Sequence, residues 1–384
     1  MREKGLNKRD VIEKLKRAQA KDLRYSDGKI LSSFCTSPHP IAKKAAAMFF
    51  DANLGDPGLF PGAAQLEKEA ITCLAKLLHG SNTCGGFILS GGTEANLLAM
   101  SVARNKSKIN KPEVIIPESA HFSFNKICNL LGIRLVKASS DKSFRVDPDS
   151  VEELINDDTV AIVGNAGSAE LGTVDPIEKL SEIAIRHALP LHVDAAFGGL
   201  VLPFLKRIGY STPKFDFEIE GVKSITVDPH KMGMSIIPSG GIIFRNIEEM
   251  NCVRTETPYL TEQYQYTFAG TRPGASAAAT WAVFEFLGIE GFKKTVEHCM
   301  SLTTLLYEGL EEANFEVLLR PTINIVAFRS QNSMKLVEEM RKHGWYTSYV
   351  PRLDCIRVVL MPHSTRQNIL DFLESLRGTK KTEA

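Results

Sequence analysis

Short runs of apolar, often β-branched residues alternate with amphipathic helical patterns along the middle of the chain, from about residue 60 to residue 250. The amphipathic stretches include 93–104 and 177–187, where apolar residues recur with helical spacing. The predicted strands are 87–89, 114–116, 160–163, 189–193, 224–227 and 241–244. Strands and helices in this alternation predict a largely parallel α/β sheet that is covered by helices on both faces.

The pattern changes after Pro273. An alanine-rich stretch at 274–287 predicts a long connecting helix, and the order that follows is helix, strand, strand, helix, strand, strand, helix. This order predicts a second, smaller α+β domain. The predicted division of the chain is an N-terminal arm at 1–55, a large domain at 56–274 and a small C-terminal domain at 275–384.

Composition and charge describe an ordinary globular protein of 384 residues. The 46 basic and 45 acidic residues leave a net charge of +1, and 43% of the residues are hydrophobic. The densest basic run, at 8–21, also contains Asp10 and Glu13, so it predicts a solvated amphipathic helix. We therefore expect no nucleic-acid partner.

The cysteines and the amino terminus point to a cytoplasmic protein. The seven cysteines are scattered without a C-x-x-C pair, which predicts neither a disulfide framework nor a metal site. The first residues lack the apolar core of a signal peptide, and no stretch approaches the ~18 apolar residues of a membrane span. A reducing cytoplasm fits best, with no membrane partner.

Glycines and a hydroxyl group follow the first predicted strand. The run SGGTEAN at 90–96 opens a predicted helix. Its glycines permit a close backbone approach, the start of the helix presents unpaired N–H groups, and Thr93 adds a hydroxyl, so Gly92 and Thr93 favour a phosphate. A plain strand-to-helix turn explains the same residues, and the run is not a P-loop.

Ionisable residues follow three further strands, and ligands collect at this edge of an open α/β sheet. Asp194 needs a cation or a hydrogen-bond donor if it is buried, although a helix N-cap is the simpler alternative. Lys231 follows His230, in a place where partial desolvation can lower its pKa and produce a nucleophilic amine. The imidazole of His121 can stack on a planar ring, and the small Ala196 leaves room for one.

Each of these residues alone has an ordinary structural explanation, such as a surface lysine or a structural histidine. Taken together, they form an anion cradle, a carboxylate, a lysine and an imidazole at one edge of the sheet. Pyridoxal phosphate needs this combination: a helix start for its phosphate, an aspartate for its ring nitrogen and a lysine for its aldehyde.

The sequence resembles the pyridoxal-phosphate-dependent group II amino-acid decarboxylases, and most closely the archaeal L-tyrosine/L-aspartate decarboxylases. The resemblance covers nearly the whole chain, and HVDAAFGG and DPHK are its most specific motifs. The motifs are NLGDPGLFPG at 53–62, SGGTEANLLA, AHFSF, HVDAAFGG, ITVDPHKMGM, AGTRPG and IRVVLMPH at 356–363. The run NAGSAE at 165–170 departs from the family pattern, although Ser168 keeps a hydroxyl.

The resemblance implies the fold-type I architecture of pyridoxal-phosphate enzymes, with a mainly parallel seven-stranded sheet and a smaller C-terminal α+β domain. It implies that Lys231 holds the cofactor, that Asp194 contacts the ring nitrogen and that His121 stacks on the ring. It also implies a homodimer with shared active sites. The other implied cofactor contacts are Gly92, Thr93, Ser168, Ala196, Asp228 and His230, with Gly270 and Thr271 coming from the second subunit.

The implied reaction is loss of the α-carboxylate from an amino acid. Tyr264, His121 and His230 are the candidates for the acid that protonates the α-carbon, and Arg357 is the candidate partner of a substrate carboxylate. The implied substrates are L-tyrosine, giving tyramine for methanofuran biosynthesis, and L-aspartate, giving β-alanine for coenzyme A biosynthesis. Two alternatives remain open: another pyridoxal-phosphate lyase that breaks a carbon–carbon or carbon–sulfur bond, and a nucleotide-binding regulatory protein without catalysis.

Overall fold

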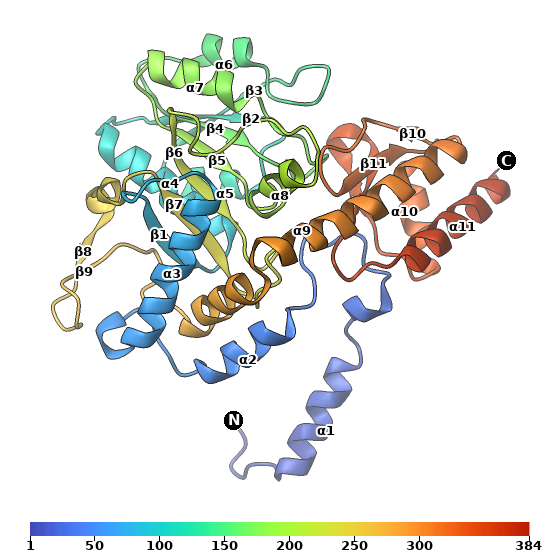
Figure 1. The fold of residues 1–384 in the computed structure, drawn as a ribbon, viewed down its shortest axis with the longest axis horizontal. Coiled ribbons are helices and arrows are strands. Elements are labelled where there is room, and N and C mark those ends of the chain that lie inside the picture. Colours follow the sequence, from blue (N-terminus) through green and yellow to red (C-terminus); the bar gives the residue numbers. More distant parts are fainter. Residues whose placement is uncertain (384) are drawn as a thin grey trace.

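The computed structural model describes residues 1–383, with side chains up to residue 379, so only Ala384 of the predicted small domain lies outside the described residues. Its largest element is a seven-stranded sheet in the order β1-β7-β6-β5-β4-β2-β3 (Figure 1). The strands are β1 (Gly85–Leu89), β2 (Glu113–Pro117), β3 (Arg134–Ala138), β4 (Thr159–Asn165), β5 (Leu191–Asp194), β6 (Val222–Val227) and β7 (Gly240–Phe244). The six predicted strands are confirmed, and β3 is an additional edge strand that the hydrophobic pattern did not predict.

The sheet is mainly parallel, as expected for fold-type I. Strands β3, β2, β4, β5 and β6 pair in parallel, whereas β7 runs antiparallel to both β6 and β1. The carboxyl ends of the five parallel strands therefore meet at one edge of the sheet, where ligands bind in open α/β folds.

Helices cover both faces of the sheet because neighbouring strand residues point to opposite sides. Val114 packs with helices α4 and α5, and its neighbour Ile115 packs in the larger core on the other face. Both sides of β4 are buried, which explains its continuous apolar sequence. The helices are α4 (Gly92–Ser107) and α5 (Ser123–Leu131) on one face, and α3 (Pro61–Leu77), α6 (Pro148–Leu154), α7 (Ile177–Arg186) and α8 (Leu202–Arg207) on the other.

A long helix, α9 (Gly274–Glu312), connects the large sheet to a smaller one (Figure 1). Gly288, with φ 52° and ψ −168°, breaks the helix at the end of the predicted 274–287 segment. The second sheet has the order β10-β11-β13-β12, and α10 (Ser333–Lys342) and α11 (Arg366–Glu383) accompany it. Its strands are β10 (Glu316–Val317), β11 (Ile325–Arg329), β12 (Ser348–Val350) and β13 (Cys355–Val359). The element order after Gly288 is the predicted one.

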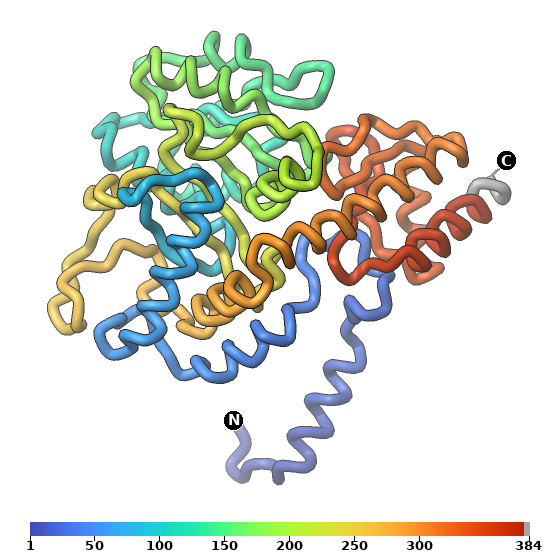
Figure 2. Tube along the Cα trace, viewed as in Figure 1, coloured from blue at the N-terminus to red at the C-terminus, as the bar shows by residue number. Residues whose placement is uncertain are grey.

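The N-terminal segment reaches both sheets. Helix α1 (Lys8–Gln19) extends away from the body and has no buried residue (Figures 1 and 2). Further along, the Leu31 amide donates to the Tyr346 carbonyl at 2.8 Å, which ties the segment to the small sheet, and α2 (Pro40–Met48) packs against α9. The chain between these two contacts passes close to the edge of the large sheet. Within residues 1–383, no helix is long and apolar enough to cross a membrane.

Candidate active site

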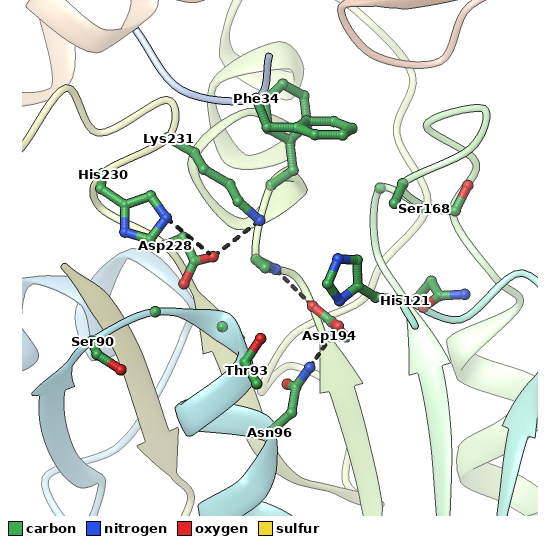
Figure 3. Close-up of a pocket in the computed structure, with 17 residues that line it drawn as sticks. Phe34, Ser90, Thr93, Asn96, His121, Ser168, Asp194, Asp228, His230 and Lys231 are labelled. Carbon is green, nitrogen blue, oxygen red and sulfur yellow. Dashed lines mark hydrogen bonds and ion pairs between the residues drawn. The ribbon is translucent and has the colours of Figure 1, made fainter. Parts of the chain in front are cut away.

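A cavity of about 350 Å³ lies at the carboxyl ends of the parallel strands (Figure 3). Most of the predicted site residues contribute to its wall, although they come from five separate segments of the chain. The predicted residues that line it are Gly92, Thr93, His121, Ser168, Asp194, Ala196, Asp228, His230 and Lys231. The structure therefore brings the helix start, the carboxylate, the imidazole and the lysine to one place.

Lys231 enters this cavity from the turn that follows β6. Its Nζ lies 3.0 Å from Asp228 Oδ2 and 5.7 Å from the centroid of the Phe34 ring. Burial works to lower the pKa of the Lys231 ammonium, but the Asp228 and Asp194 carboxylates outweigh it, so the pKa is raised. The expectation that desolvation lowers this pKa is therefore wrong for the free lysine, because an acidic neighbour follows the same strand.

Asp228 and His230 lie beside the lysine. Asp228 Oδ1 is buried, and among the described residues it has no hydrogen-bond partner. His230 Nδ1 accepts a hydrogen bond from the Ser239 amide at 3.1 Å, and burial lowers the pKa of the imidazole. The neutral ring therefore carries its hydrogen on Nε2, which lies 3.7 Å from Asp228 Oδ2.

Asp194 ends β5 and is 8% exposed. One of its carboxylate oxygens accepts the Ala196 amide at 3.1 Å, and the other accepts Nδ2 of Asn96 at 2.8 Å (Figure 3). N–H donors on both oxygens fix the orientation of the carboxylate at the cavity wall.

His121 forms another wall of the cavity (Figure 3). Its Nδ1 accepts the Ser123 amide at 3.3 Å and lies 2.9 Å from the Ser123 hydroxyl. Burial lowers the pKa of His121, so the ring is favoured in its neutral form with hydrogen on Nε2. A neutral imidazole held in this way has a flat face available for a planar ligand.

Four predicted residues do not line the cavity. Tyr264 is on β9 (Tyr264–Gln265), which pairs with β8 (Thr255–Glu256), and its ring lies 4.5 Å from the Arg254 guanidinium carbon. Gly270 accepts a hydrogen bond from Gln265 through its carbonyl, and Thr271 is exposed. Within one chain, none of these three reaches the lysine. The fourth, Arg357, lies next to the cavity instead.

Arg357 reaches the edge of the site from β13. Its guanidinium donates to the Ser32 carbonyl at 3.1 Å, to the Ser348 hydroxyl at 2.9 Å and to the Ala169 carbonyl. It lies 4.5 Å from the centroid of Phe34, the ring that Lys231 also approaches. Burial lowers the pKa of Arg357 to about 10, and no carboxylate of the described residues pairs with it.

Residues 51–331 match the family model described as the pyridoxal-dependent decarboxylase conserved domain. The chain belongs to this decarboxylase family. Among its relatives, a probable L-tyrosine/L-aspartate decarboxylase of Methanothermobacter thermautotrophicus is 47% identical over 94% of this chain and 100% of that protein. An L-aspartate/L-glutamate decarboxylase of Pyrococcus horikoshii is 47% identical over 97% of each chain.

Two solved structures share this fold over nearly the whole chain. A sphingosine-1-phosphate lyase of Burkholderia pseudomallei superposes with a TM-score of 0.92 at 27% identity, covering 99% of this chain and 92% of that one. A glutamate decarboxylase of Lactobacillus brevis gives a TM-score of 0.89 at 20% identity, with 99% and 94% coverage, which is a likeness of fold alone.

The cofactor of the family, pyridoxal phosphate, fits the residues of this decarboxylase. Gly91 has φ 153°, and a Cβ at Gly92 would lie 2.9 Å from Asp228 Oδ2 and 3.3 Å from Ala196 Cβ, so side chains here would fill the cradle. Because α4 begins at Gly92, the amides of Gly92 and Thr93 have no backbone partner within the helix, and they favour a phosphate. Gly92 and Thr93 would hold the phosphate, Asp194 the ring nitrogen, His121 the ring face and Lys231 the aldehyde carbon.

Several residues that line the cavity were not among the predicted cofactor contacts. Phe34 comes from the N-terminal segment, and nothing in its local sequence signals a site. Asn96 and Asn165 also line the cavity. An asparagine in the buried first turns of α4 was the available signal for Asn96, because a buried amide needs polar partners.

Proposed function

We propose that this decarboxylase removes the α-carboxylate of L-aspartate, L-tyrosine or both. The products would be β-alanine for coenzyme A biosynthesis and tyramine for methanofuran biosynthesis. The relatives from Methanothermobacter and Pyrococcus, named as tyrosine/aspartate and aspartate/glutamate decarboxylases, support an acidic or phenolic amino acid as the substrate. The pyridoxal-phosphate cofactor and the decarboxylase family are the established part of this assignment.

The unpaired guanidinium of Arg357, beside the cavity, is the observation that carries the substrate proposal. A half-buried cation without an anion partner is costly, and a substrate carboxylate would complete it. Nearby Arg352 provides a contrast, because it already pairs with Glu170 and with Glu118, the latter at 2.9 Å. Of these two arginines at the edge of the site, only Arg357 therefore has charge left to offer a ligand.

The proposed roles of the other residues follow from their positions. Pyridoxal phosphate, when bound, supplies a ring that accepts the electron pair left by departing CO2. Lys231 would hold the cofactor until the substrate amine displaces it, and Asp194 would balance the positive charge at the ring nitrogen. His121 would cover one face of the ring and exclude water from it.

A proton must then reach the α-carbon. His121 and His230 each carry a hydrogen on Nε2 at the wall of the cavity, so they are the candidates that this chain itself supplies. Tyr264 remains a candidate only as a residue of a second subunit, because within its own chain it lies on β9, away from the cavity.

We also propose a homodimer in which Gly270 and Thr271 complete the cofactor site of the other subunit. Exposed aromatic side chains support an interface on this side of the molecule, since large apolar groups in contact with water mark association surfaces. Phe50 is 82% exposed, Tyr259 86% and Phe268 68%. Tyr259 and Phe268 lie in the same segment, 255–273, as Gly270 and Thr271.

The reaction is tested with the cofactor-loaded protein and each amino acid labelled with carbon-14 in its α-carboxylate. We expect labelled CO2 together with β-alanine or tyramine, and no release from the Lys231→Ala protein. Release from neither substrate would refute the proposal. An aldehyde product without CO2 would instead support the carbon–carbon lyase alternative.

A further inference from the structure

Asp194 stands at the end of a chain of buried polar side chains on the α4 face of the sheet. His192 and Asp194 point to the same face because they are two residues apart on β5, and Ser224 and Thr226 do the same on β6. Asn96 of α4 lies over these four residues. All five side chains are at most 8% exposed, so their hydrogen bonds are protected from water.

Hydrogen bonds connect Asp194 through Asn96 and His192 to Ser224. Asn96 donates from Nδ2 to Asp194 Oδ2 at 2.8 Å, as Figure 3 shows. On its other side, Asn96 Oδ1 lies 3.0 Å from His192 Nε2 and accepts the Thr226 hydroxyl at 2.6 Å. His192 Nδ1 in turn lies 2.8 Å from the Ser224 hydroxyl.

The protonation state of His192 follows from these partners. Asn96 Oδ1 can only accept, so His192 Nε2 must carry a hydrogen, and Nδ1 then accepts the hydroxyl hydrogen of Ser224. Burial lowers the pKa of His192 to about 4, which keeps the ring neutral near neutral pH with this single N–H. The imidazole is therefore a fixed donor toward Asn96.

The Asp194 carboxylate can only accept, so it requires Nδ2 of Asn96 to face it, and the His192 N–H on the other side supports the same orientation. Rotating the amide by half a turn would place its Nδ2 against the His192 N–H and its Oδ1 against the Asp194 carboxylate. Both contacts would then be repulsive. Thr226 does not impose this orientation alone, because its hydroxyl is able to donate or to accept.

We propose that His192 and Asn96 are positioning residues, which act through Asp194 to keep the ring nitrogen of the cofactor protonated. The inference rests on the proposed contact between Asp194 and that nitrogen. An N–H donor held against Asp194 Oδ2 stabilises the charged carboxylate, and a charged carboxylate stabilises a protonated ring nitrogen. His192 does not itself line the cavity, and it acts only through the orientation of Asn96.

The test compares two substitutions of one residue. His192→Leu removes the donor, whereas the amide of His192→Gln can place an N–H near the position of Nε2. Each holoenzyme is loaded with cofactor labelled with nitrogen-15 in the ring, and the nitrogen NMR shift reports its protonation. Ser181→Ala is the matched control. Ser181 also carries a buried hydroxyl group on the sheet side of a helix, and this hydroxyl accepts the Gly221 amide at 2.9 Å. It makes no hydrogen bond with Asp194.

We expect His192→Leu to shift the ring nitrogen toward its unprotonated form and to lower kcat about tenfold or more, as loss of supporting partners does at metal sites, with KM nearly unchanged. His192→Gln and Ser181→Ala should resemble the wild type in both measurements. A protonated nitrogen and a normal kcat in His192→Leu would overturn the proposal. Equal losses in the two His192 variants would also overturn it, since they would indicate packing rather than donation.

Two further variants keep the test decisive. Ser224→Ala removes only a hydroxyl group, and it should shift the nitrogen signal in the same direction by a smaller amount even if His192→Leu does not fold. Asp194→Asn tests the underlying contact separately. If the ring nitrogen stays protonated in Asp194→Asn, the proposed role of Asp194 fails, whereas a shift there without one in the His192 and Ser224 variants refutes the positioning role alone.

Discussion

The Lys231 ammonium lies 3.0 Å from a carboxylate oxygen of Asp228, the residue that directly follows β6. This ion pair stabilises the charged lysine, so the amine must lose a proton before it can attack an aldehyde. Asp228 therefore holds the nucleophile in place and at the same time keeps it in its unreactive form. The balance between these two effects is open to measurement.

Lys231 is expected to be the residue that carries the cofactor. It is the lysine whose side chain lines the cavity between the phosphate cradle and Asp194. Reduction of the holoenzyme with borohydride, followed by peptide mapping, should place the pyridoxyl group on Lys231. A label on any other lysine contradicts the site described here.

Asp228→Asn should make cofactor attachment possible at lower pH. The pKa of Lys231 is raised because the Asp228 and Asp194 carboxylates outweigh the effect of burial. Attachment by the wild-type apoenzyme should therefore accelerate with rising pH through the neutral range, as the free amine becomes more abundant. Without the Asp228 charge, the pKa falls and the same acceleration occurs at lower pH. The rate of the cofactor's absorbance change on mixing measures both profiles, and coincident profiles would contradict this account.

Mixing two inactive variants tests whether the active sites are shared. Thr271 is exposed and lies outside the cavity of its own chain. If it completes the partner's site, a heterodimer of Lys231→Ala and Thr271→Arg contains one site with both wild-type residues. Activity should therefore reappear after subunit exchange, up to about half of the wild-type value per heterodimer. Exchange without recovered activity would show that each subunit has a self-contained site.

The positions at the ends of strands were predictable from sequence, because parallel strands bring their carboxyl ends to one edge. That rule alone placed Asp194, Lys231 and His121 together. The edge strand β3 was harder to predict, since Arg134 and Lys137 are exposed on it and interrupt the apolar pattern.

Contacts between distant segments were not predictable. Phe34 reaches the cavity only because the N-terminal segment crosses from the small sheet to α9. The roles of Asn96 and His192 depend on hydrogen bonds between residues 96 positions apart in the chain. No local pattern encodes such a pairing.

His192 should make the fold less stable in mild acid. Burial lowers the pKa of His192 from 6.5 to about 4. Below pH 6.5 the unfolded chain therefore binds a proton at His192, whereas the folded protein does not bind it until about pH 4. This loss amounts to about 3 kcal/mol once the pH reaches 4. His192→Gln should lose less stability than the wild type between pH 7 and pH ~4.5 in urea unfolding.

Asp175 acts in the opposite direction, because burial raises its pKa to about 6 and acid therefore relieves its penalty. Since Asp175 is present in both proteins, its contribution cancels from the comparison. Parallel stability curves for wild type and His192→Gln would show that His192 takes up its proton equally in both states.

Arg357→Met and Arg352→Met form a matched pair that tests how the substrate is held. The two arginines lie at the same edge of the site, but Arg352 is occupied by Glu170 and Glu118, whereas Arg357 donates only to uncharged oxygens. Removing the partner of a desolvated carboxylate costs far more than removing a partly exposed ion pair. We expect kcat/KM for aspartate to fall roughly 100-fold or more in Arg357→Met and less than about tenfold in Arg352→Met.

The tyrosine reaction of Arg357→Met then identifies which carboxylate Arg357 binds. If tyrosine turnover survives while aspartate turnover is lost, Arg357 binds the side-chain carboxylate that tyrosine lacks. If both are lost and urea unfolding shows a normal fold, Arg357 binds the α-carboxylate that the two substrates share. The stability measurement is informative because Met removes a half-buried, unpaired charge along with its hydrogen bonds. Unchanged kcat/KM for both substrates in Arg357→Met would show that the unpaired guanidinium has no part in binding either of them.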